Sequence, residues 1–155
     1  MSVFSKLLAV SRRKSPWIYH AAAGSCNGCD IEIIPCITPR YDAEQIGVVL
    51  QTTPKHADIL LVTGAHTRRL REAVLDIYTE MPSPKAVVAI GSCPASCNVF
   101  YGSPTLVGDT IDEVIPVDVW VPGCPPRPQL IMDGIAQAAR LLAEGRTADQ
   151  QGRRT

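Results

Sequence analysis

The most informative segment of the chain reads Gly24-Ser25-Cys26-Asn27-Gly28-Cys29-Asp30-Ile31-Glu32. It sets two cysteines two residues apart among small and flexible neighbours. Glycine lets the backbone turn sharply and approach a sulfur closely, and proline stiffens a loop. Two later segments combine cysteine with the same residue types, and they read Gly91-Ser92-Cys93-Pro94-Ala95-Ser96-Cys97 and Pro122-Gly123-Cys124-Pro125-Pro126. We therefore expect three tightly specified loops that together form one site.

Each cysteine segment follows an apolar run that reads as a β-strand. These runs are apolar through most of their length, which suits strands covered on both faces, as in a parallel sheet. Helical periodicity lies between and after them. The expected strands are 17–23, 46–51, 57–63, 85–90 and 118–122, and the expected helices are 31–37, 67–81 and 127–144. Strands that alternate with helices predict an α/β domain with a mostly parallel sheet, which we place at 16–145.

The two ends of the chain read differently from this domain. Residues 1–15 form a basic, amphipathic pattern, which indicates either a helix packed on its own domain or a docking helix for a membrane-bound partner. Residues 146–155 read as a polar tail that we expect to be frayed. No apolar run approaches the ~20 residues that cross a bilayer. The basic residues near the start of the chain are not followed by the apolar segment that an export signal requires, so we expect no export signal.

Composition narrows the class of protein. The chain has 155 residues, 46% hydrophobic and 19% charged, with zero formal net charge and six cysteines. This length suits one domain, and the charge balance does not favour nucleic acid as a partner. A protein without an export signal stays in the cytoplasm, where thiols remain reduced. Six cysteines there indicate metal or redox chemistry rather than structural disulfides.

The positions of the cysteines point to one shared site. The carboxyl ends of parallel strands gather at one edge of a sheet, and all three cysteine segments follow such ends. Cys26, Cys29, Cys93 and Cys124 would supply four thiolates, the ligand set of a [4Fe-4S] cluster. A lone pair of cysteines at this spacing also suits a zinc site or a thioredoxin-like redox pair. Spacing alone leaves these alternatives open.

The three segments together resemble the small subunit of [NiFe] hydrogenases and its relative in respiratory complex I, the 20 kDa subunit. The resemblance extends over about residues 16–143. The matching stretches are Gly24-Ser25-Cys26-Asn27-Gly28-Cys29-Asp30-Ile31-Glu32, Ala89-Ile90-Gly91-Ser92-Cys93 and Val121-Pro122-Gly123-Cys124-Pro125-Pro126-Arg127-Pro128. The resemblance implies a flavodoxin-like three-layer fold. It also implies one [4Fe-4S] cluster, held by loops at the carboxyl ends of the strands.

The first segment indicates the branch of this family. Complex I subunits have two adjacent cysteines there, whereas this chain has them two residues apart, as hydrogenases do. Its shortness resembles the small subunit of the membrane-bound, energy-converting hydrogenases of the Ech and formate hydrogenlyase type. That resemblance implies three kinds of partner: a Ni–Fe large subunit, a ferredoxin-like polyferredoxin subunit and ion-translocating membrane subunits. It implies a peripheral position on the cytoplasmic face of the membrane. The alternative is a cluster subunit of a quinone or polysulfide reductase, and a zinc or scaffold protein is a third interpretation.

Several residues near the site remain to be assigned. Ser96, Cys97 and Asn98 stand where relatives usually carry glycine, and Cys97 is an alternative to Cys93 as third ligand. Cys36 reads as a buried small hydrophobe. Glu32 reads either as a proton-transfer group or as a carboxylate favoured by the helix start. The three histidines, which are His20, His56 and His66, are not spaced as metal ligands, and we expect structural or surface roles for them.

Overall fold

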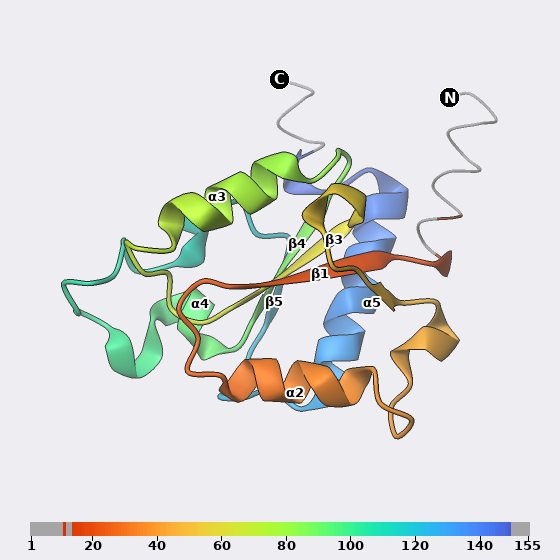
Figure 1. Ribbon diagram of the computed structural model, residues 1–155, viewed down its shortest axis with the longest axis horizontal. Coiled ribbons are helices and arrows are strands. Elements are labelled where there is room, and N and C mark those ends of the chain that lie inside the picture. Colours follow the sequence, from red (N-terminus) through yellow and green to blue (C-terminus); the bar gives the residue numbers. More distant parts are fainter. Residues whose placement is uncertain (1–10, 12–13, 150–155) are drawn as a thin grey trace.

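The computed structural model describes residues 11 and 14–149, and its centre is a parallel β-sheet (Figure 1). The five strands are β1 (Trp17–Ala22), β2 (Val49–Leu50), β3 (Ile59–Thr63), β4 (Ala86–Ile90) and β5 (Val119–Val121). Every pairing is parallel, and the order across the sheet is β2-β1-β3-β4-β5. This is the strand order of the flavodoxin-like folds. The predicted fold class is confirmed.

Helices cover both faces of the sheet and make three layers. The α-helices are α2 (Gly28–Cys36), α3 (Arg71–Glu80), α4 (Ser92–Ser96) and α5 (Pro128–Glu144), and the short 3-10 turns are η1 (Ala43–Ile46), η2 (Pro54–His56), η3 (Asn98–Phe100) and η4 (Ile111–Glu113). In Figure 1, α3 lies above the sheet and α2 lies below it. α5 shares a hydrophobic cluster with α2, on the side of the sheet opposite α3. α4 lies at the end of the sheet rather than on a face.

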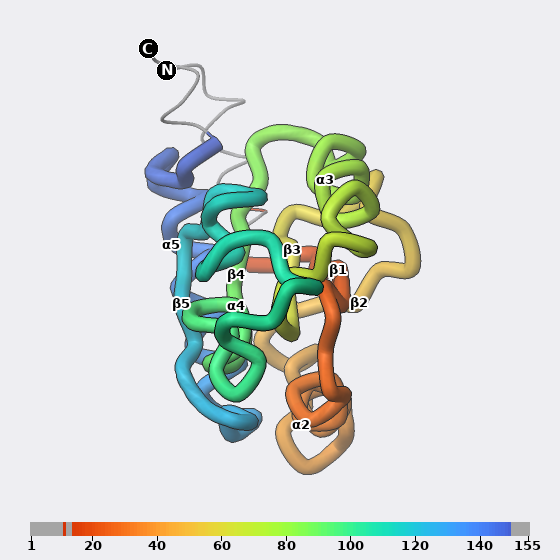
Figure 2. Tube along the Cα trace, turned by 90° about the vertical axis from the view of Figure 1, so that its left-hand side faces the viewer, coloured from red at the N-terminus to blue at the C-terminus, as the bar shows by residue number. Residues whose placement is uncertain are grey.

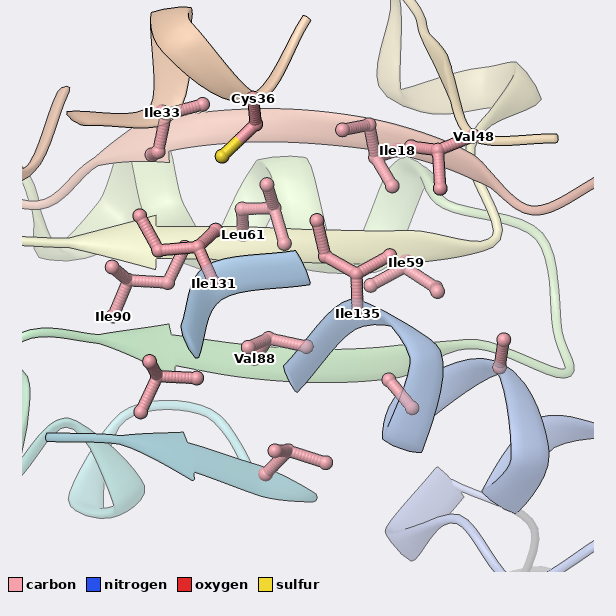
Figure 3. Packing of buried hydrophobic residues seen from close by; sticks show 14 of the residues in the cluster. Ile18, Ile33, Cys36, Val48, Ile59, Leu61, Val88, Ile90, Ile131 and Ile135 are labelled. Carbon is pink, nitrogen blue, oxygen red and sulfur yellow. The ribbon is translucent and has the colours of Figure 1, made fainter. Parts of the chain in front are cut away.

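The central strands are buried because both of their faces are covered. Ile59 and Leu61 of β3 belong to the cluster that α2 and α5 complete, whereas Leu60 and Val62 belong to the cluster on the α3 side. Figure 3 shows the first cluster, in which Ile131 and Ile135 of α5 project toward β3 and β4. The alternation of side chains along a strand explains this division. The continuous apolar runs of β3 and β4 therefore correspond to strands buried on both sides.

Three element bounds differ by more than two residues from the sequence-based expectation. The strand expected at 46–51 is reduced to Val49–Leu50, because the chain before it folds into η1 and turns at Gly47 with φ 87°. The helix expected from residue 67 begins at Arg71, since Thr67 instead bridges to Leu106. The helix expected from residue 31 begins at Gly28. In each case a local turn or a long-range contact overrides the apolar pattern.

The two ends of the chain differ in how much of each the structure describes. The helix expected at 1–15 lies outside the described residues except for Ser11 and 14–15. The start of the 146–155 tail is ordered rather than frayed, because Thr147 is fully buried and the Ala148 amide donates to Asp118 Oδ1 at 2.6 Å. Within residues 11 and 14–149, no helix combines the length and apolar character needed to cross a bilayer.

Candidate metal centre

The three cysteine segments lie at the carboxyl edge of the sheet. The first follows β1, the second follows β4 and folds into α4, and the third follows β5. Figure 2 is turned toward this edge, with α4 near the viewer and α2 below it. In the first segment, Asn27 adopts φ 71° and its carbonyl accepts from the Ile31 amide, so the chain enters α2 at once and Cys29 lies in the first helical turn. The fold thus brings loops from three strands to one edge.

Direct contacts join the loops to one another. The Gly91 amide donates to the Val121 carbonyl at 2.8 Å, and the Ser92 amide donates to the Gly123 carbonyl at 2.8 Å. The Ser92 hydroxyl also donates to the Gly123 carbonyl, at 3.1 Å. Gly91 has φ 96°, and a β-carbon on it would lie 2.6 Å from Cys29 Sγ. The second loop is therefore hydrogen-bonded to the third loop. It packs against the first loop at the sulfur of Cys29, one of the four predicted ligands.

The buried thiols of Cys29 and Cys93 lie within electrostatic range of each other and of Cys26 and Cys124. Burial raises the pKa of Cys29 to about 11, and the neighbouring Cys93, Asp30, Cys26 and Cys124 contribute to the rise. Burial also raises the pKa of Cys93, with Cys124 and Cys26 as the next causes. Cys29 and Cys93 are each 8% exposed, whereas Cys26 and Cys124 are on the surface. The four cysteines singled out in the sequence are thus gathered at one place, two inside and two at its rim.

Cys97 takes a different direction from these four. It ends α4 with φ 54° and is fully buried. Its Sγ donates to the Asp109 carbonyl at 3.4 Å and lies 3.9 Å from His66 Nδ1. Burial is the main cause that raises the pKa of Cys97, followed by the charges of Asp109 and Glu113. Among the causes that raise the pKa of Cys93, Cys97 comes last. The side chain of Cys97 therefore faces the 108–109 loop.

Cys36 and Glu32 lie on α2, beyond the cysteine loop. Cys36 is 3% exposed, and its Sγ is 3.5 Å from the carbonyl oxygens of Glu32 and Pro128. Figure 3 shows it beside Ile33 in the core between α2 and the sheet. Burial raises the pKa of this thiol to about 11. The expectation of a buried small hydrophobe at this position is confirmed, and Glu32 is a half-buried residue of the same helix.

The sequence did not single out a polar network beneath the first loop. His20 Nε2 lies 2.9 Å from Asp30 Oδ1, and Thr63 Oγ1 donates to the same oxygen at 2.5 Å. Burial acts to raise the pKa of Asp30, but hydrogen bonds from Ser25 and Thr63 and the nearby His20 outweigh it and hold the pKa below its ordinary value. Asp30 directly follows Cys29, so the network anchors the first loop to β1 and β3. In the sequence, the only sign of this network was the position of Asp30 directly after Cys29.

The donor set fits an iron–sulfur group. Thiolates are soft ligands, and sets of four cysteines hold both iron–sulfur clusters and zinc. Thiols with raised pKa values ionise reluctantly in the absence of a cation, so a bound metal group would supply the positive charge that stabilises them as thiolates. Among residues 11 and 14–149, no three His, Cys, Asp or Glu side chains stand close enough together to hold a single metal ion.

Comparison with known proteins places the chain among redox subunits. The profile of the family described as NADH ubiquinone oxidoreductase, 20 Kd subunit, matches residues 26–138. The probable membrane-bound hydrogenase subunit mbhJ of Pyrococcus furiosus is 55% identical over 131 residues, which are 84% of this chain and 78% of that protein. Formate hydrogenlyase subunit 7 of Escherichia coli is 41% identical over 132 residues, or 85% of this chain, but these span only 51% of that subunit.

Solved structures show similar folds. A chain of the membrane-bound sulfane sulfur reductase, an archaeal respiratory membrane complex, superposes with a TM-score of 0.79 at 34% identity, over 90% of this chain and 77% of that chain. A chain of an NAD⁺-reducing [NiFe]-hydrogenase gives a TM-score of 0.55 at 22% identity, over 76% of this chain and 86% of that chain. At the latter identity the likeness concerns the fold alone.

Proposed function

This chain belongs to the family of the 20 kDa subunit of NADH ubiquinone oxidoreductase, and we propose that it is the electron-transfer small subunit of a membrane-bound [NiFe] hydrogenase. The observation that carries the proposal is the gathering of four cysteine thiols from three strand ends. The similarity to hydrogenase subunits of Pyrococcus furiosus and Escherichia coli supports the hydrogenase branch. The two-residue spacing between Cys26 and Cys29 supports it as well.

The proposed cofactor is one [4Fe-4S] cluster with Cys26, Cys29, Cys93 and Cys124 as its ligands. Four thiols that share one neighbourhood supply the ligand set that a [4Fe-4S] cluster requires. Cys97 is the weaker candidate for the third ligand, since its sulfur faces the Asp109 carbonyl. When bound, the cluster supplies one-electron transfer between a ferredoxin-like subunit and the Ni–Fe site of the large subunit.

The four proposed ligands differ in burial, which gives them different positions around such a cluster. Cys29 and Cys93 would hold the cluster from the buried side, and Cys26 and Cys124 would hold it at the rim that a partner would cover. Close to that rim, exposed apolar side chains form the segment 99–101, with Val99 at 81% exposure and Tyr101 at 66%. Exposed apolar groups beside a redox site suit contact with the large subunit. The chain alone would have no hydrogenase activity.

Glu32 is the proposed proton-transfer residue of this chain. It lies on α2 one helical turn after Cys29, and the residue is half-buried. A carboxylate at such a place can pass protons between a buried site and solvent. Glu32→Gln keeps the shape of the side chain and removes its ability to ionise. We expect slower H₂ evolution by the variant complex at unchanged iron content, and an unchanged rate would remove this role.

The proposed assembly places the chain on the cytoplasmic face of a membrane complex. Its partners would be the Ni–Fe large subunit, a ferredoxin-like polyferredoxin subunit and membrane subunits that move H⁺ or Na⁺. The relatives' names, which include a membrane-bound hydrogenase, support the membrane complex. Peripheral attachment through residues 1–15 stays a prediction, because that segment is largely outside the described residues.

Anaerobic purification of the intact complex tests the proposal. Beyond the iron and sulfide of the Ni–Fe and ferredoxin-like subunits, we expect about four irons and four sulfides per copy of this chain, and an EPR signal that appears on reduction. We expect to find a large subunit with two Cys-x-x-Cys pairs, the ligands of a Ni–Fe site. Zinc at about one per chain, in place of iron, would overturn the proposal.

The second candidate function is a cluster subunit of a sulfur or polysulfide reductase complex. The observation that favours it is the close structural likeness to a chain of the sulfane sulfur reductase. This candidate has the same fold and the same four thiols, so the partner distinguishes the two. A large subunit without the paired Cys-x-x-Cys motifs, and a complex that reduces polysulfide but makes no H₂, would select it.

A further inference from the structure

Two residues directly after α4 adopt a backbone conformation that ordinarily belongs to glycine. Cys97 has φ 54° and Asn98 has φ 45°. The left-handed region costs non-glycine residues about 1–2 kcal/mol, although asparagine tolerates it better than most. Cys97 fills buried space beside Ala65 and Leu106. The side chain of Asn98 is exposed, so packing does not explain it.

The Asn98 side chain reaches a sulfur of the metal centre. Its Nδ2 donates a hydrogen bond to Cys124 Sγ at 3.4 Å. A thiolate can only accept hydrogen bonds, so the amide nitrogen is the end of the side chain that suits this neighbour. The contact joins the second cysteine loop to the third, across 26 positions of sequence.

Cys124 has a particular need for such a donor. Pro125 and Pro126 follow it, and proline has no backbone N–H. The two peptide units directly after this ligand therefore offer no amide to its sulfur. A donor must come from elsewhere in the fold, and Asn98 provides one.

Backbone hydrogen bonds hold the donor and the acceptor in place. Asn98 opens η3, in which the Phe100 amide donates to the Cys97 carbonyl at 2.9 Å and the Tyr101 amide donates to the Asn98 carbonyl at 3.1 Å. On the other side, Ser92 is bonded to the Gly123 carbonyl through both its amide and its hydroxyl. Hydrogen bonds thus fix the backbone of both loops that make the contact between Asn98 and Cys124.

We propose that Asn98 is a positioning residue that raises the reduction potential of the cluster at this site, through the hydrogen bond that it donates to Cys124 Sγ. One-electron reduction adds negative charge that the ligand sulfurs share. A donor directed at such a sulfur stabilises the more negative, reduced state over the oxidised one, and the potential rises. The inference rests on the proposed function, since it requires a cluster with Cys124 among its ligands.

The test is an EPR-monitored redox titration of the intact complex, purified anaerobically. Asn98→Gly removes the amide and suits the positive φ, whereas Asn98→Asp keeps the shape but presents a carboxylate that cannot donate. We expect full iron content and a lower potential in the first variant, and a still lower one in the second because of its added charge. At a fixed potential, the reduced-to-oxidised ratio should fall about tenfold in Asn98→Gly, which is about 59 mV for a one-electron couple.

Ser96→Ala is the matched control. Ser96 is an exposed residue of the same loop, and its hydroxyl donates to the Ser92 carbonyl at 3.2 Å rather than to a cysteine sulfur. Its variant should titrate as the wild type does. Asn98→Gly with full iron content and an unchanged or higher potential would overturn the proposal. Loss of the cluster in both Asn98 variants would also overturn it, since Asn98 would then be a structural residue. A wild-type complex whose iron is fully accounted for by its other subunits would instead refute the proposed function.

Discussion

Gly91→Ala should prevent a metal cluster from assembling on this chain. Gly91 follows β4 and has φ 96° and ψ 171°, a region of backbone space that is essentially reserved for glycine. A β-carbon there would lie 2.6 Å from Cys29 Sγ, whereas ordinary contact begins at 3.4 Å. The methyl group and the ligand sulfur cannot both keep their positions.

The structure sets the size of the effect. Holding alanine in this conformation costs about 1–3 kcal/mol of folding free energy. The contact adds a displacement of Cys29 Sγ several times larger than the ~0.2 Å that metal–ligand distances tolerate. Gly91 cannot move away from Cys29 freely, because its amide is bonded to the Val121 carbonyl at 2.8 Å. Loss of cluster occupancy should therefore exceed what the lost stability alone would cause.

Two other glycines provide the controls. A β-carbon on Gly28 would lie 3.6 Å from Cys26 Sγ, an ordinary contact beside a ligand-type sulfur. Gly102 has φ 76°, but a β-carbon added to it would meet no described heavy atom within 4 Å, so Gly102→Ala carries the backbone strain without the clash. Iron per complex, measured after anaerobic purification, should be close to wild type in both controls and lower by about four irons per copy of this chain in Gly91→Ala. Full iron content in Gly91→Ala would refute the reasoning.

Three further predictions concern the site and its support. Cys93→Ser should lose the cluster, whereas Cys97→Ser should keep it and lose only about 1 kcal/mol of stability, and the opposite result in iron analysis would make Cys97 the third ligand. Burial raises the pKa of Asp118 above its ordinary 3.8, so the free energy of unfolding should fall as pH rises from that value through the folded pKa and then stay level. Asp118→Asn should flatten this dependence in urea titrations, and equal slopes would contradict the assignment. Lys85, which is 6% exposed, donates to two carbonyls at the end of α3, so Lys85→Met should lower the free energy of unfolding by about 1–3 kcal/mol, and an unchanged melting temperature would refute that role.

Patterns that repeat along the chain predicted the elements with the most burial. The strands at 57–63 and 85–90 were predicted within two residues of β3 and β4, because strands covered on both faces need continuous apolar runs. The helix at 127–144 was predicted within one residue of α5, since its buried side chains recur at helical spacing. β2 was overestimated, because an apolar run does not reveal the turn at Gly47.

The sequence also predicts the chemistry of the proposed ligands. Two cysteines at close spacing and two more beside glycine and proline specify soft donors on short loops, and residue type alone determines that chemistry. Cys36 could be set aside in the same way, since an apolar helix position predicts burial.

The direction of each sulfur and the partners around it depend on contacts between distant residues. Cys97 lies four positions from Cys93, yet its φ of 54° turns its sulfur to the Asp109 carbonyl. Cys29 meets Gly91, and Asn98 meets Cys124, only because parallel strands deliver their carboxyl ends to the same edge. No local sequence pattern predicts these contacts, because they arise from the order of the strands and from backbone torsions.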